Sequence, residues 1–200
     1  QGHAAYQHLA DNPVRGILQL TQALMDPPFD AGTDAFPPTN LEVTSIDVGN
    51  SATNVIPARA RAIFNIRFND TWTADSVKEE ILRRLNKAAA GGSLREGRPP
   101  VRFDITWSER PSHVFLTRNE PLIASLSAAV ETVTGRKPAL STTGGTSDAR
   151  FIKDYCPVVE FGLVGQTMHM VDERVSVADL ETLTVIYQTF IEQWFAHADA

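Results

Sequence analysis

The sequence has little cysteine and no excess of positive charge. Cys156 is the single cysteine among 200 residues, so an intrachain disulfide is excluded, which fits a reducing compartment. The formal net charge is -6 at pH 7, without the basic patch that nucleic-acid-binding proteins carry. We therefore expect a cytoplasmic protein that has no nucleic-acid partner, in which Cys156 is a buried structural thiol.

Long hydrophobic runs and targeting signals are also missing. No apolar stretch is long enough to span a bilayer, and Gln1-Gly2-His3 lacks the basic and hydrophobic segments of a signal peptide. An initiator methionine is absent as well. We therefore expect no membrane partner, and we expect the chain to be cut from a longer parent.

Residues 1–113 show the pattern of an α+β domain. Strands are predicted at residues 1–6, 41–48, 58–68 and 101–107, and helices are predicted after Asn12 and after Thr73. The alternation of apolar and polar residues in the third and fourth strands indicates a sheet with one covered face. The order β-α-β-β-α-β predicts a ferredoxin-like fold whose second sheet face is free for a partner.

Residues 114–200 have a different pattern. A helix is predicted between Asn119 and Gly135, strands at 138–142 and 158–164, and a last helix after Ser176. The nearly continuous apolar run 158–164 is typical of a strand buried on both faces. Two strands are too few to close an α/β sheet, so we expect the C-terminal part of a larger α/β domain.

Four polar clusters could carry chemistry: residues 1–8, 49–57, 142–150 and 169–173. Each cluster also has a purely structural interpretation. In the same order, these are exposed polar residues at a strand end, a hairpin connection, a flexible turn and a loop histidine with a structural role. The motifs HExxH and CxxC are absent. The chain is therefore not expected to hold a complete metal site by itself.

Taken together and in order, the clusters resemble the succinyl-diaminopimelate desuccinylase family of the aminoacylase/carboxypeptidase-type two-zinc metallohydrolases. The motifs are Gly-His-Ala-Ala-Tyr-x-His-Leu-Ala-Asp-Asn-Pro, Thr-Asn-Val-Ile-Pro, Gly-Gly-Thr-Ser-Asp-Ala-Arg-Phe and His-Met-Val-Asp-Glu. The resemblance covers essentially the whole chain. It implies a lid, or dimerisation, domain at residues 1–113 and the C-terminal part of the catalytic domain at residues 114–200.

The resemblance also implies an activity. Enzymes of this family are homodimers that use two zinc ions, for which cobalt can substitute. They hydrolyse N-succinyl-LL-2,6-diaminopimelate to succinate and LL-2,6-diaminopimelate in lysine and diaminopimelate biosynthesis.

Roles for single residues follow from the same resemblance. His169 matches the C-terminal zinc ligand of the family, and His3 matches the lid histidine that stabilises the oxyanion in the partner subunit's active site. The positions implied to contact substrate are Tyr6, Asn54, Arg67, Gly145 and Thr146.

The chain departs from the family pattern in several places. Gln7 stands where proline is common, and Gly165 stands where some members have asparagine. The first zinc histidine, the bridging aspartate and the catalytic glutamates have no counterpart, so we expect the isolated chain to be inactive. Two alternatives stay open: acetylornithine deacetylase or another aminoacylase-type amidohydrolase, and a dimerisation module without catalytic function.

Overall fold

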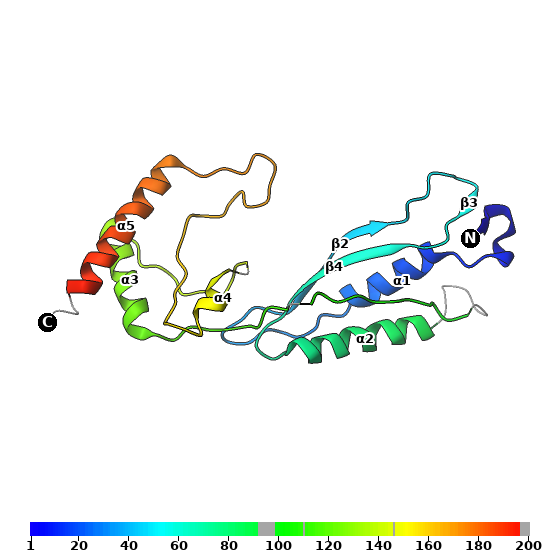
Figure 1. Cartoon of the computed structure of the whole chain (residues 1–200), viewed down its shortest axis with the longest axis horizontal. Coiled ribbons are helices and arrows are strands. Elements are labelled where there is room, and N and C mark those ends of the chain that lie inside the picture. Colours follow the sequence, from blue (N-terminus) through cyan, green and yellow to red (C-terminus); the bar gives the residue numbers. More distant parts are fainter. Residues whose placement is uncertain (92–98, 110, 146, 197–200) are drawn as a thin grey trace. The chain divides into compact units, whose positions relative to one another are not determined.

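The computed structural model describes residues 1–91, 99–109, 111–145 and 147–196. The chain divides into two compact units, Gln1–Val114 and Phe115–Ala200 (Figure 1). The identity of the two units as a lid domain and part of a catalytic domain stays a prediction. No helix in the described ranges has the length and apolar content that crossing a membrane requires.

The helices of the first unit begin and end at local signals. Helix α1 (Pro13–Met25) follows Asn12, whose side chain accepts a hydrogen bond from the Val14 N–H (3.1 Å). Helix α2 (Ala74–Ala90) starts at a capping box made by Thr73 and Ser76. Because such caps use residues within a single helical turn, the sequence alone predicted both helices, and both are confirmed.

Within its described residues, the first unit has two separate two-stranded antiparallel sheets. Strand β2 (Asn40–Asp47) pairs with β4 (Arg61–Arg67), and β1 (Gly2–His3) pairs with β3 (Val55–Ile56). Exposed and half-buried residues alternate along β4, as the sequence predicted. Residues 4–6 do not continue the first predicted strand, because η1, a 3-10 helix (Ala4–Leu9), begins there.

The prediction for residues 101–107 is confirmed in part. Its apolar residues Val101, Phe103, Ile105 and Trp107 pack against the core, and the residues between them are exposed. No strand pairing is assigned to it, so the predicted faces are confirmed and the predicted strand is wrong. The apolar residues of an extended segment can be buried on one side by any layer that packs against them. A β-strand also needs a hydrogen-bonded neighbouring strand about 4.8 Å away. The described residues thus have a mixed α/β fold, and the ferredoxin-like arrangement is not confirmed.

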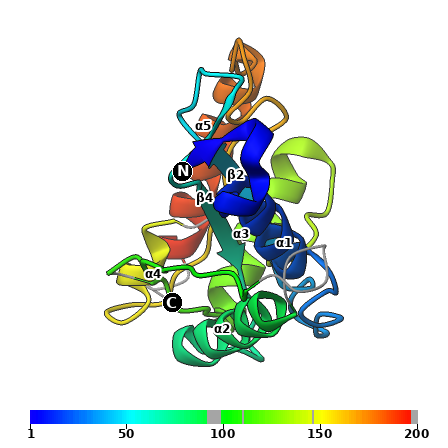
Figure 2. The same ribbon diagram turned by 90° about the vertical axis from the view of Figure 1, so that its right-hand side faces the viewer.

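The core of the first unit lies between the two helices and the β2–β4 sheet. Figures 1 and 2 show α1 and α2 running along this two-stranded sheet. The buried residues of this core are Leu20, Leu24, Leu41, Val77, Ile81, Leu85 and Ala89. Ile81 at the centre is 0% exposed, so the unit has a fully closed interior of its own.

A polar cluster ties the loop after α1 to the start of α2. The Asp30 carboxylate accepts hydrogen bonds from the backbone N–H groups of Gly32 and Thr39, from Asn69 Nδ2 (2.7 Å) and from Trp72 Nε1 (2.7 Å). Burial raises the pKa of Asp30, but the hydrogen bonds from Thr39 and Trp72 outweigh that effect and hold the pKa well below its ordinary value.

The second unit is built on two packed helices. Helix α3 (Glu120–Thr134) begins after Asn119 and ends at Gly135, whose φ of 68° is left-handed. Helix α5 (Val177–Ala196) packs on α3, and the short helix α4 (Ala149–Ile152) lies between them in sequence. The buried cluster is Leu126, Val130 and Ile186.

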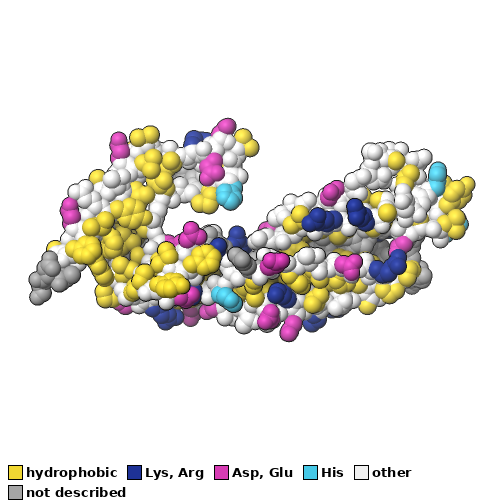
Figure 3. Space-filling view, in the orientation of Figure 1, with side chains coloured by type: hydrophobic (Ala, Val, Ile, Leu, Met, Phe, Trp, Pro, Cys, Tyr) yellow, Lys and Arg dark blue, Asp and Glu magenta, His cyan; other side chains and the backbone are white. Residues whose placement is uncertain are grey.

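Two predictions for the second unit are wrong. Residues 138–142 and 158–164 form no strands, because the structure gives them no neighbouring strand with which to pair. Cys156 is exposed and not buried. Figure 3 shows hydrophobic side chains gathered over α3 and α5, and Ile186 is the single buried residue of α5 in the described range.

Candidate functional site

The pairing of β1 with β3 brings the first two polar clusters together. Gly2 lies opposite Ile56 and His3 lies opposite Val55. Beyond this pair, the Ala4 N–H donates to the Asn54 carbonyl (2.9 Å). His3 lies in β1 and Asn54 in the turn directly before β3, so these two residues, 51 positions apart in the sequence, lie close together. The sequence identified each cluster but gave no indication of this pairing.

His3 is held in one tautomer by its own backbone. Its Nδ1 accepts a hydrogen bond from the Ala5 N–H (3.1 Å), which caps η1. Because Nδ1 is the acceptor, a neutral ring carries its proton on Nε2. His3 is exposed, so this Nε2–H donor is available to an anionic group.

Aromatic rings continue from His3 along η1. The rings of His3 and Tyr6 lie 5.6 Å apart, and those of Tyr6 and His8 lie 6.4 Å apart at nearly a right angle. Tyr6 is 57% exposed. The first cluster is therefore a solvent-accessible row of three rings that could contact a ligand through edges and polar tips.

Asn50, which was not among the predicted site residues, organises the loop that carries Asn54. Its side chain donates to the carbonyls of Ala52 and Val55 (2.8 Å to Val55) and accepts from the Ala52 N–H. The preceding Gly49 has a φ of 59°, a conformation for which glycine is suited. A Gly-Asn pair before a strand is the signal that could have identified this role.

Arg67 is not brought to His3 within one chain. Arg67 is the last residue of β4 and pairs with Asn40. β3, which pairs with the strand of His3, comes before the first residue of β4. The length of this strand separates its ends by roughly 20 Å, at about 3.3 Å per residue. Arg67 is exposed, and its substrate contact stays a prediction.

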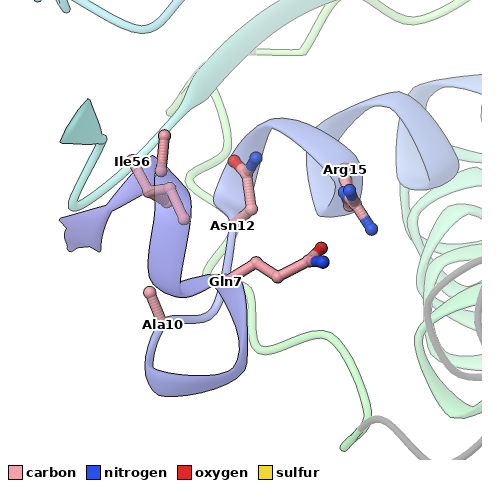
Figure 4. Close-up of a pocket in the computed structure, with 6 residues that line it drawn as sticks. Gln7, Ala10, Asn12, Arg15 and Ile56 are labelled. Atoms are coloured by element: carbon pink, nitrogen blue, oxygen red, sulfur yellow. The ribbon is translucent and has the colours of Figure 1, made fainter. Parts of the chain in front are cut away.

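A small hollow lies between η1 and the start of α1 (Figure 4). Its volume is about 140 Å³. The residues that line it are Ala4, Gln7, Ala10, Asn12, Arg15 and Ile56. The sequence did not identify Arg15 as a residue of this hollow. The feature that could have identified it is a positively charged residue in the first turn of the helix that follows the first polar cluster.

In the second unit, His169 lies in an exposed loop. Its φ is 60°, and its backbone N–H donates to Glu173 Oε2 (3.2 Å). The loop is closed by Thr167, whose Oγ1 donates to the Arg174 carbonyl (2.8 Å) and accepts from the Arg174 N–H (3.0 Å). The imidazole is thus at the surface of this unit, where it can reach a cation, and not inside a hydrocarbon core.

One histidine does not make a metal centre. Within the described ranges, three or more His, Cys, Asp or Glu residues nowhere gather in a way that could hold a metal ion. A zinc ion takes about four ligands. The role of His169 as a zinc ligand stays a prediction, and the described residues do not by themselves supply the other ligands.

The glycine segment of the third cluster is open. Gly144 has a φ of 148°, and neither Gly144 nor Gly145 has another atom within 4 Å of an added Cβ. Both are exposed, so their backbone is accessible to a ligand. Thr146 lies outside the described residues. The predicted contact of Gly145 and Thr146 with a substrate carboxylate stays a prediction.

Comparison with known proteins adds a family and a fold. Residues 1–93 match the family model described as M20_dimer, the peptidase dimerisation domain. The chain is similar in structure to aminopeptidase PepT from Bacillus cereus ATCC 10987, with a TM-score of 0.52 and 17% sequence identity over 88% of this chain. The chain covers 44% of the aminopeptidase chain, and at this identity the likeness shows the fold alone. Residues 1–93 are therefore similar to a peptidase dimerisation domain, and the likeness to the aminopeptidase concerns the fold of the chain.

Proposed function

We propose that this chain forms the lid and the C-terminal catalytic part of a metal-dependent hydrolase of the M20 peptidase type, and that this hydrolase is a succinyl-diaminopimelate desuccinylase. The β1–β3 pairing carries the proposal, because it joins His3 and Asn54, which come from two separate motifs of the desuccinylase pattern. The reaction would release succinate and LL-2,6-diaminopimelate from the N-succinyl compound. We propose a cytoplasmic homodimer, in line with the match to a dimerisation domain.

His3 would act on the carbonyl oxygen of the scissile amide. The hydrogen bond at Nδ1 orients the ring and leaves the Nε2–H as donor. A donor placed where negative charge develops in the transition state accelerates such reactions by about 10²–10³-fold. His3 would therefore stabilise the oxyanion, in the active site of the partner subunit as the family resemblance implies.

The remaining residues would bind substrate and metal. Arg67 and the Gly145 backbone would hold substrate carboxylates through charge-assisted hydrogen bonds, and Tyr6 and Asn54 would contact the substrate beside His3. His169 would supply one zinc ligand. Zinc, when bound, would supply an activated water and a Lewis acid for the amide carbonyl.

The test is an assay of the longer polypeptide that includes the upstream metal ligands. We expect zinc-dependent release of succinate from N-succinyl-LL-2,6-diaminopimelate, and a kcat reduced by about 10²–10³-fold in His3→Ala. The matched control is His113→Ala, which changes an exposed histidine outside the four polar clusters and should leave kcat near wild type. His169→Ala should lower the zinc content measured by elemental analysis.

Each other outcome identifies an alternative. Faster cleavage of N-acetylornithine than of the succinyl substrate would indicate another amidohydrolase of the same superfamily. A dimer seen by light scattering, without bound zinc and without turnover, would indicate a dimerisation module, as the description of the matched family model allows.

A further inference from the structure

We draw no further inference here: the strongest candidate, the edge of β2 that faces no other strand among the described residues together with the exposed Leu18 and Met25 of the neighbouring helix α1, carries nothing new, because a surface for a second copy of this chain restates the dimerisation that the matched family model describes.

Discussion

The two units of this chain differ in how they use their apolar residues. In the first unit, two helices and a two-stranded sheet enclose Ile81 completely, and Asp30 ties the surrounding loops together through four hydrogen-bond donors. In the second unit, α5 buries only Ile186 within the described range, while Phe195 and Val164 are each 62% exposed. The first unit therefore has a core of its own, whereas the second shows two helices with much apolar surface left in water.

The largest effect that would test this comparison comes from truncating the two central isoleucines. We expect Ile81→Ala to lower the free energy of unfolding of the first unit by about 2–5 kcal/mol, since a buried side chain is replaced by a cavity. Ile186→Ala in the second unit should fall near the lower end of that range, because a small cluster can collapse around the gap. Urea unfolding followed through the separate indole signals of Trp72 and Trp194 measures the two units.

Ile63→Ala is the matched control for the first unit, because Ile63 is 47% exposed on β4. Its loss should stay within about 0.5 kcal/mol, as is usual for surface positions. Equal losses for Ile81→Ala and Ile63→Ala would contradict the closed core of the first unit.

The polar cluster around Asp30 gives an intermediate effect. Asp30→Asn should cost about 2 kcal/mol, because charge-assisted hydrogen bonds become neutral ones and one amide N–H group faces donors. Asp34→Asn, an exposed change in the same loop, should stay within about 0.5 kcal/mol. Thermal or urea unfolding at pH 7 compares the two variants. A similar loss of unfolding free energy in both would show that the Asp30 cluster does not stabilise the first unit.

The same residue predicts an acid dependence. The pKa of Asp30 is lowered in the folded state, so its contribution is complete above the unfolded-state pKa near 4 and is lost as the pH falls toward the folded-state value. The urea midpoint of the wild type should therefore drop more steeply below about pH 4 than that of Asp30→Asn. Parallel curves for the two proteins would mean that other carboxylates govern the acid response.

The smallest effect concerns the outward side of α5. Val185 and Ile191 are 49% and 52% exposed, so replacing both by glutamine should change stability by no more than about 0.5 kcal/mol per site. Binding of a dye that fluoresces on exposed hydrophobic surface should fall in the double variant. A large loss of stability would show that these side chains are packed in the chain by itself and would weaken the contrast between the units.

Part of the candidate site could be read from the sequence. His3, Asn54 and His169 stand in motifs that mark them as polar loop or strand-end residues, and the structure places all three at the surface. The hollow beside Arg15 could not be found in this way, because its walls come from η1, from the start of α1 and from β3. Arg67 illustrates the converse, since the family resemblance grouped it with His3 and the structure places it at the far end of β4.

The sequence by itself determined the elements whose signals are local. Asn12, Thr73 and Asn119 cap their helices through hydrogen bonds to residues two or three positions away, and such bonds need no tertiary contact. Alternation of apolar residues likewise determined which side of residues 61–67 and 101–107 faces the core. Strand pairing was decided only by the tertiary structure, because each backbone N–H and C=O of a strand needs a partner supplied by a distant part of the chain. That requirement joined His3 to the strand after Asn54 and left residues 158–164 unpaired.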